Sequence, residues 1–142
     1  MKGIRIRPEK RGLEAVLFDL EAEIMEFVWG QEDARVSVQD VVDELSRDRD
    51  VAYTTVLTTV RRLFDKGLLA RTKDGKRYLY LARMSRREFH EELARVLMRS
   101  LPPAGRAAAF ATLVDEAAQE DDQALARLEA MVRKRRKEKR DE

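Results

Sequence analysis

The stretch that decides the fold is AYTTVLTTVRRLFDKGL, residues 52–68. Six of its residues are β-branched, a composition that favours a strand. Its apolar side chains nevertheless recur at the i, i+4, i+7 and i+8 positions of a helix, as Val56, Val60, Leu63 and Phe64. Gly67 follows as a natural helix stop. This periodicity outweighs a propensity cost of roughly a few tenths of a kcal/mol per residue, so we predict a helix over residues 52–66.

A β-hairpin is predicted directly after this helix. Asp74-Gly75 separates two short segments, residues 68–73 and 76–81, and Asp-Gly in this position is a strong signal for a two-residue type I′ turn. In that register Lys73 faces Lys76, Thr72 faces Arg77 and Arg71 faces Tyr78. The tip of the hairpin is therefore cationic, and its base is apolar, with Leu69, Leu79, Tyr80 and Leu81.

Amphipathic helices are predicted on both sides of this pair. The first has Asp19 as its N-cap, ends at Gly30, and carries the apolar residues Leu20, Ile24, Phe27 and Val28. Ser37 and Asp40 form a capping box for a second helix. Ser85 and Glu88 form another, for a helix that ends at Pro102-Pro103. Two more helical stretches follow, around residues 110–117 and 125–132.

The order helix, helix, helix, hairpin predicts a winged helix-turn-helix, in which the third helix enters the DNA major groove and the hairpin reaches along the backbone. We expect a mainly α protein with a small β-hairpin wing. Its predicted parts are a basic N-terminal arm (1–12), a winged helix-turn-helix DNA-binding domain (13–84), a helical dimerisation region (85–132) and a basic tail (133–142).

The dimerisation region is predicted from its apolar stripes. Each of the three C-terminal helices carries one, and a monomer of this size would struggle to bury them all. Packing against an identical copy would cover them. The residues that we assign to this surface are Phe89, Leu93, Val96, Leu97, Leu101, Phe110, Leu113, Val114, Leu125 and Leu128.

Composition limits the classes of protein that this chain of 142 residues can be. It has 39% charged residues, 44% hydrophobic residues and no cysteine, so disulfides, thiolate metal sites and cysteine nucleophiles are excluded. No apolar run approaches the roughly 18 residues that cross a bilayer. The basic N-terminus has no apolar core after it, so no secretory signal is expected. These features indicate a folded cytoplasmic protein with no cofactor, no bound metal and no membrane partner.

The net charge of +2 conceals a segregation of charge along the chain. Residues 13–50 hold 3 basic and 12 acidic side chains, whereas residues 51–87 hold 10 basic and 2 acidic ones. A local excess of +8 is typical of a surface that binds a polyanion. A solvated basic face without a partner is the other interpretation of this pattern.

The chemistry of the predicted third helix favours DNA as that polyanion. With the apolar stripe turned inward, its outward face collects Thr54, Thr55, Thr58, Arg61, Arg62 and Asp65. Threonine hydroxyls bond phosphates and bases, threonine methyls pack on thymine methyls, and arginine pairs with phosphate or guanine. The tip of the hairpin adds the cations Lys73, Lys76 and Arg77.

Two segments resemble a known family. LFDLEAEIMEFVW, residues 17–29, is similar to the first helix of the penicillinase-repressor family, which includes BlaI, MecI and the copper-responsive CopY branch. The shared features are a leucine, an acidic residue, an Ile-Met pair and a closing tryptophan. Residues 52–68 resemble the recognition helix of that family, with its Thr-Val step, Arg-Leu pair and Lys-Gly exit. The resemblance runs from about residue 17 to residue 132.

The resemblance implies a homodimeric transcriptional repressor of an inverted-repeat operator, with the dimer made by the C-terminal helices. By position, its DNA contacts would be Tyr53, Thr54, Thr55, Thr58 and Arg62, with the wing at residues 73–77.

The sequence also departs from the family. Members that respond to β-lactams are cut by a membrane protease at an Asn-Phe bond; the matching bond here is Ala109-Phe110, and the chain has no asparagine, which argues against that signalling protease. The cysteines of the copper-sensing branch are absent. Ala52 stands where a serine commonly begins the recognition helix, so Asp50 or no residue would cap it.

Enzymatic chemistry is not expected. His90-Glu91-Glu92-Leu93-Ala94 begins like a zinc-protease His-Glu-x-x-His helix, but alanine stands where the second histidine is required. Asp48, Asp50, Glu91 and Glu92 are typical surface charges. The alternatives to a sequence-specific repressor are a winged-helix protein-interaction adaptor and a non-specific DNA-binding protein.

The C-terminal tail holds seven basic residues in eight, at positions 133–140. Such runs are usually solvated and mobile. Its alternative role is to add non-specific phosphate contacts that raise DNA affinity in a salt-dependent way.

Overall fold

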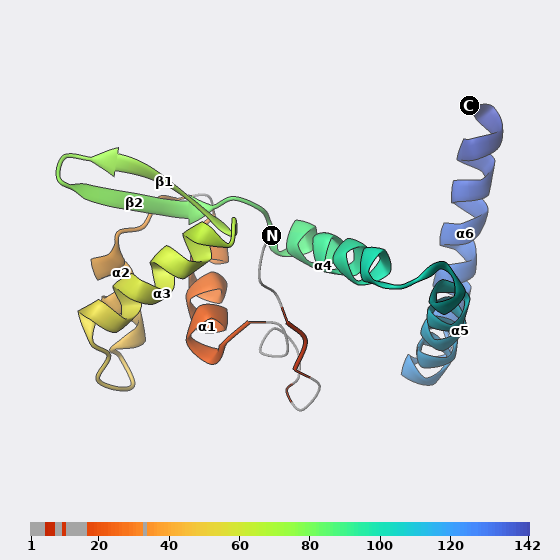
Figure 1. Ribbon diagram of the computed structural model, residues 1–142, viewed down its shortest axis with the longest axis horizontal. Coiled ribbons are helices and arrows are strands. Elements are labelled where there is room, and N and C mark those ends of the chain that lie inside the picture. The colour runs from red at the N-terminus through yellow and green to blue at the C-terminus, as the bar shows by residue number, and fades with distance from the viewer. Residues whose placement is uncertain (1–4, 8–9, 11–16, 33) are drawn as a thin grey trace. The chain divides into compact units, whose positions relative to one another are not determined.

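The computed structural model describes residues 5–7, 10, 17–32 and 34–142 (Figure 1). Most of the predicted basic arm, residues 1–12, therefore lies outside the described residues. The chain divides into two units, residues 1–93 and 94–142. Among the described residues, the elements are α1 (Asp19–Trp29), α2 (Val38–Leu45), α3 (Tyr53–Asp65), β1 (Leu69–Asp74), β2 (Arg77–Ala82), α4 (Arg86–Ser100), α5 (Pro103–Glu120) and α6 (Ala124–Asp141).

The first unit has the order of elements that the sequence predicts for a winged helix-turn-helix. Helix α3 contacts α1 and α2 on one side and the hairpin β1–β2 on the other (Figure 1). Val36, just before α2, pairs with Tyr80 through two backbone hydrogen bonds of 2.8 and 2.7 Å and so joins that segment to the hairpin. The buried core includes Ile24, Met25, Val28, Val41, Val56, Val60, Leu63, Leu69, Tyr80 and Phe89.

Helix α3 confirms that periodicity outweighs β-propensity in residues 52–66. Its β-branched residues Val56 and Val60 are 0% and 1% exposed, so packing compensates their low helix propensity. Ala52 occupies the N-cap and supplies no side-chain hydrogen bond. Of the two predicted possibilities, a cap from Asp50 or no cap, the helix therefore has no side-chain cap. Gly67 has a φ of 83°, the left-handed conformation that favours glycine after a helix.

Two predicted capping boxes are confirmed. In α2 the Ser37 hydroxyl accepts the Asp40 N–H at 3.0 Å, and the Asp40 carboxylate accepts the Ser37 N–H at 2.8 Å. Ser85 and Glu88 make the same exchange at the start of α4. The predicted cap of α1 is wrong, because Asp19 is its first helical residue and the N-cap is Phe18.

The hairpin forms with a different turn from the predicted one. Asp74 pairs with Arg77, so the two-residue loop is Gly75-Lys76 rather than Asp74-Gly75. Gly75 has a φ of 63° and Lys76 does not have a positive φ, the pattern of a type II′ turn with glycine at its first central position. Lys73 faces Tyr78 and Arg71 faces Tyr80, so every partner is displaced by two residues. The predicted faces survive, because side chains alternate with a period of two.

Helix α4 begins in the core of the first unit. The Phe89 side chain is completely buried, with its ring centroid 5.7 Å from that of Trp29, whose indole N–H donates to the Met84 carbonyl at 2.9 Å. The assignment of Phe89 to a dimerisation surface is therefore wrong, because no part of it is exposed to a second chain. Leu93 is partly buried against the same core.

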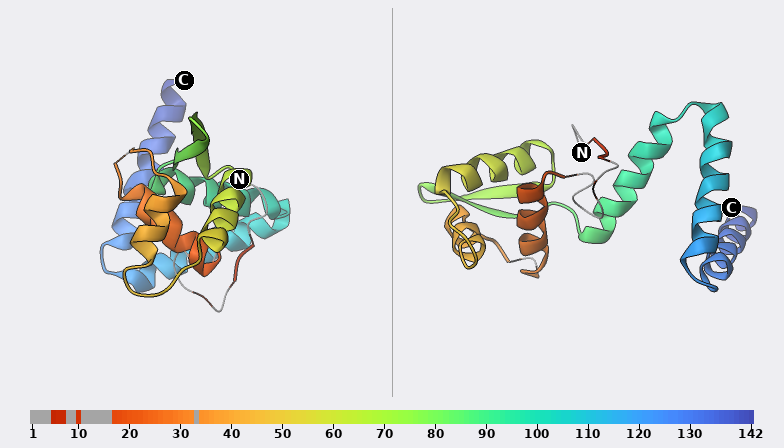
Figure 2. Two further views of the ribbon diagram at one scale, coloured as in Figure 1. Left: turned by 90° about the vertical axis from the view of Figure 1, so that its left-hand side faces the viewer. Right: turned by 90° about the horizontal axis from the view of Figure 1, so that it is seen from below.

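The second unit contains α5 and α6, which contact each other (Figure 2). Helix α5 has no buried residue, and Ala124 is the one buried residue of α6. Helix α6 continues to Asp141, so residues 133–140 of the predicted basic tail are helical, and all of them are exposed. In the described part of the chain, no helix is both long enough and apolar enough to span a membrane.

Candidate nucleic-acid interface

One buried stripe fixes the orientation of α3 and so decides which side chains it exposes. Val56, Val60 and Leu63 point into the core, and Thr59 completes the buried side at 5% exposure. The exposed residues of α3 include all of its predicted DNA contacts: Tyr53, Thr54, Thr55, Thr58, Arg61 and Arg62. These side chains are therefore accessible to a ligand.

The exposed threonines differ in the hydrogen bonds that they can offer. The Thr58 hydroxyl donates to the Thr54 carbonyl at 2.9 Å, which uses its one proton and leaves its lone pairs and methyl group for a ligand. Among the described residues, the Thr54 and Thr55 side chains make no hydrogen bond. Their hydroxyls can both donate and accept, so they suit phosphate oxygens and base edges alike.

The arginines of α3 are exposed cations. Within the part of the chain that the structure describes, neither Arg61 nor Arg62 forms an ion pair. Uncompensated surface cations concentrate positive potential and attract polyanions. A guanidinium can also hydrogen-bond phosphate or guanine through two parallel N–H groups.

The wing contributes three exposed cations. Arg77 lies 3.4 Å from the Asp74 carboxylate, in a pair whose side chains are 64% and 56% exposed. Such exposed pairs contribute about 0–1 kcal/mol and give way easily to a stronger partner. Lys73 and Lys76 form no ion pair among the described residues. The wing therefore keeps positive charge available at its tip.

A groove of about 270 Å³ lies between α3, the start of α2 and the wing. Its lining residues include Tyr53, Leu57 and Arg61 from α3 and Lys76, Arg77, Tyr78 and Tyr80 from the hairpin. The groove brings together four of the predicted contacts, Tyr53, Arg61, Lys76 and Arg77. The others, Thr54, Thr55, Thr58, Arg62 and Lys73, do not line it. Aromatic rings beside cations suit a sugar–phosphate strand, which combines apolar sugar faces with anionic oxygens.

Arg71 is a residue that the sequence analysis did not assign to the site. Its guanidinium lies 4.0 Å from the ring centroid of Phe64 in α3 and 4.2 Å from that of Tyr78 in β2. The position of Arg71 between these two rings holds the wing against α3. The sequence placed Arg71 and Tyr78 on the same face of the hairpin, which indicated their contact. It did not indicate the contact with Phe64, because Phe64 lies on α3.

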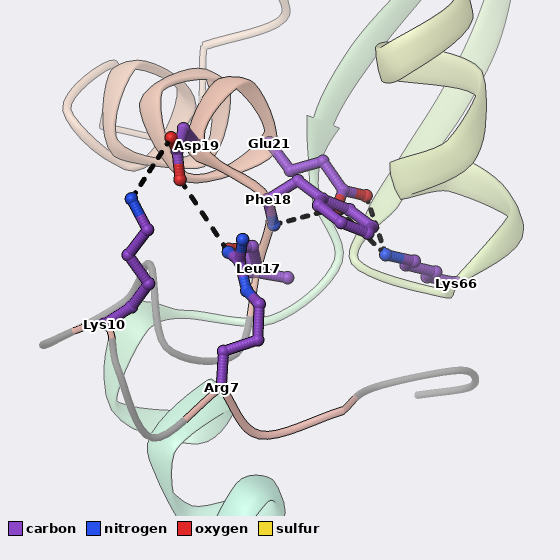
Figure 3. A network of polar contacts seen from close by, with 7 residues as sticks. All are labelled: Arg7, Lys10, Leu17, Phe18, Asp19, Glu21 and Lys66. Carbon is purple, nitrogen blue, oxygen red and sulfur yellow. Dashed lines mark hydrogen bonds and ion pairs between the residues drawn. The ribbon is translucent and has the colours of Figure 1, made fainter.

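A buried ion pair fixes the C-terminal end of α3 (Figure 3). Lys66 Nζ lies 2.8 and 3.0 Å from the two carboxylate oxygens of Glu21, whose side chain is completely buried. The same carboxylate accepts the Phe18 backbone N–H at 3.1 Å. This one acidic group therefore caps α1 and anchors the exit of α3. Local sequence patterns do not reveal this ion pair, because its partners are 45 residues apart.

Two described residues of the N-terminal arm, Arg7 and Lys10, contact the same region (Figure 3). Arg7 and Lys10 lie 3.8 and 3.6 Å from the Asp19 carboxylate. Arg7 also donates to the Leu17 carbonyl, and its guanidinium lies 5.0 Å from the centre of the Phe18 ring. These two basic side chains are thus directed to the start of α1.

Metal-binding residues are not gathered in this region. Among the residues that the structure describes, no group of three or more His, Cys, Asp or Glu side chains is placed to hold a metal ion. His90 is exposed on α4, with its ring centroid 5.8 Å from that of Phe89.

Comparisons with known proteins agree with this architecture. The family model described as penicillinase repressor matches residues 17–134. The transcriptional regulator BlaI of Mycobacterium tuberculosis is 38% identical over 64 residues, which are 45% of this chain and 46% of that protein. The methicillin resistance regulatory protein MecI of Mammaliicoccus sciuri is 33% identical over 60 residues, 42% of this chain and 47% of that protein.

A third relative extends further along the chain. The penicillinase repressor of Staphylococcus aureus is 25% identical over 81 residues, covering 57% of this chain and 63% of that protein. The chain thus spans about half the length of the first two relatives. The family model, in contrast, covers the winged helix and most of the C-terminal helices. The chain therefore belongs to the penicillinase-repressor family.

Proposed function

We propose that this protein is a transcriptional repressor that binds an inverted-repeat operator as a homodimer, with α3 in the major groove and the wing along the backbone. The observation that carries the proposal is the exposed face of α3, where Thr54, Thr55 and Arg62 keep their hydrogen-bonding groups free of partners among the described residues. Relatives named as a regulator and a repressor support this reading.

The dimer is proposed from the second unit. Phe110 and Leu113 of α5 are 56% and 55% exposed, and Val114 and Leu125 are 44% and 42% exposed. A helical pair that leaves such residues in water lacks the burial needed to stabilise it. A second copy would supply the missing surface, and its two-fold symmetry would match the symmetry of an inverted repeat.

The test is a comparison of two DNA duplexes by fluorescence anisotropy. The first carries the sequence upstream of the gene for this protein, and the second carries the same bases in scrambled order. A repressor that regulates its own gene should prefer the first duplex by at least about a thousandfold at physiological salt. Equal binding to both, falling steeply as salt rises, would leave a non-specific DNA-binding surface or a protein-interaction adaptor.

Single substitutions then test the assigned face. Thr55→Ala and Arg62→Ala should each weaken binding to the preferred duplex by about 1–3 kcal/mol. Arg87→Ala is the matched control, because Arg87 is an exposed arginine of the same unit that lies outside α3 and the wing. Thermal unfolding of all three variants should match that of the parent. Parental affinity in both α3 variants would show that another face binds DNA.

A further inference from the structure

The last turns of α6 carry a dense set of exposed cations. Residues 133–140 hold seven basic side chains and one glutamate, and every residue from 129 to 142 is exposed. Two of the cations are paired, Arg133 with Glu129 at 2.6 Å and Arg135 with Glu138 at 3.1 Å. Among the described residues, the remaining ones have no ion pair: Lys134, Arg136, Lys137, Lys139 and Arg140.

These cations form a regular row because they lie on a helix. Arg133, Arg136, Lys137 and Arg140 recur at i, i+3, i+4 and i+7, which places them on one face, and they line a common shallow depression with Lys139. Like charges at i, i+4 destabilise a helix. The favourable position of cations near a helix C-terminus offsets part of this repulsion, and a bound polyanion would remove more of it.

The charge spacing of this segment is similar to that of duplex DNA. Eight helical residues rise about 12 Å and carry a net charge of +6, or one charge per about 2 Å. Duplex DNA carries one negative charge per about 1.7 Å of its axis. The two linear charge densities are therefore close in magnitude and opposite in sign.

The composition of the segment distinguishes between anionic partners. Residues 133–142 contain no apolar side chain, so the segment has no apolar face to insert into a lipid surface. They contain no aromatic residue either, so there is no platform on which single-stranded bases could stack. The phosphates of a duplex require neither feature, because arginine and lysine contact them through charge alone.

We propose that residues 133–140 of α6 are a second DNA-binding surface, which contacts backbone phosphates of duplex DNA in addition to α3 and the wing. This inference rests on the proposed function and adds to it a sequence-independent contribution from the C-terminal unit. The apolar residues of α6 end at Val132, so the cationic row begins where the apolar stripe stops.

The experiment measures how DNA affinity depends on salt. The duplex has an arbitrary sequence of about 40 base pairs, or roughly four helical turns. The test variant is Arg136→Gln with Lys137→Gln and Arg140→Gln, which leaves both ion pairs of the segment in place. The control is Arg136→Lys with Lys137→Arg and Arg140→Lys, which keeps the charge at the same positions. Circular dichroism checks that the helical content is the same in both.

Three lost phosphate contacts should lower the slope of log K against log salt by about 2.7 and weaken binding about tenfold to a hundredfold at physiological salt. The charge-keeping control should retain the parental slope. An unchanged slope and affinity in the glutamine variant would overturn the inference and point to an acidic protein as the partner of this segment.

The arbitrary sequence separates this test from that of the proposed function. Loss of sequence preference in the upstream-DNA comparison would contradict the repressor but leave the slope measurement valid. A parental slope in the glutamine variant, together with a strong preference for upstream DNA, would contradict only the second surface.

Discussion

The two units of this chain are both built from amphipathic helices, but they differ in how far the apolar side chains of those helices are buried. In the first unit, α1, α2, α3 and the hairpin turn their apolar side chains toward one another, and Ile24, Met25 and Leu63 are 0% exposed. In the second unit, α5 buries no residue and Phe110 is 56% exposed. Amphipathic helices alone therefore do not make a core; a chain must also bring their apolar faces together. The first unit does this by itself, and the second leaves apolar side chains exposed.

The largest effect is expected from substitutions that introduce charge into this apolar surface. Phe110→Glu with Leu113→Glu should convert the proposed dimer to monomers. Two copies lose four buried side chains at about 1.5–3 kcal/mol each, so a loss of about 6 kcal/mol or more is expected, roughly four orders of magnitude in the dimer dissociation constant. Sedimentation equilibrium measures this constant. Thr112→Glu adds charge to the other side of α5 and should leave the dimer intact. A monomeric parent protein would refute the proposal that a second copy covers the apolar residues of the second unit.

A smaller effect is expected at Phe89, where a substitution should lower the stability of the first unit rather than disrupt the dimer. Although it lies on α4, its side chain is completely buried, so Phe89→Ala should destabilise the first unit by about 3–5 kcal/mol. The proposed dimer of the second unit should persist. Urea unfolding followed by the fluorescence of Trp29, which packs on Phe89, reports this change. His90→Ala is the neighbouring control and should stay within about 0.5 kcal/mol of the parent. If both variants unfold like the parent, Phe89 is not a core residue.

The smallest effect concerns the loop between α5 and α6. A hydrogen bond from Arg127 at 2.8 Å, followed by one from the Gln123 N–H, lowers the pKa of the Asp121 carboxyl below its ordinary value of 3.8. A lowered carboxyl pKa stabilises the fold above the ordinary value, and that contribution disappears as the pH falls through the lowered pKa. Arg127→Gln should move the pKa back toward 3.8. An NMR titration of Asp121 measures this, and an unmoved pKa would show that Arg127 is not its main partner.

Local features of the fold were predictable from the sequence. The capping boxes at Ser37 and Ser85 and the periodicity of residues 52–66 depend on neighbours within a few positions. The fold class followed from the order of these elements. The turn was misplaced by one residue because Asp74-Gly75 and Gly75-Lys76 both fit a two-residue loop, and only the pairing of Asp74 with Arg77 decides between them.

For the candidate interface, the sequence predicted which residues are exposed but not how they are arranged in space. Helical spacing was enough to expose Thr55 and Arg62 on α3. Spacing along one helix could not show that Arg61 lines a groove with the wing, or that Arg71 stacks on Phe64. The same limit applies to Phe89, because a buried and an exposed apolar stripe look alike in a sequence until the partner element is known.

The register of the wing has a consequence for how this protein can vary. When the turn moves by one residue, each pairing moves by two, and every side chain keeps its side of the hairpin. Leu69 and Tyr80, which are both buried, share one face of the hairpin with Arg71, so such a slip would exchange their cross-strand neighbours without turning any of them outward. Substitutions at the exposed tip that keep this register can change the spacing of its cations while the buried residues at the base stay packed. The wing can thus acquire new contacts by mutation without a matching change in the core.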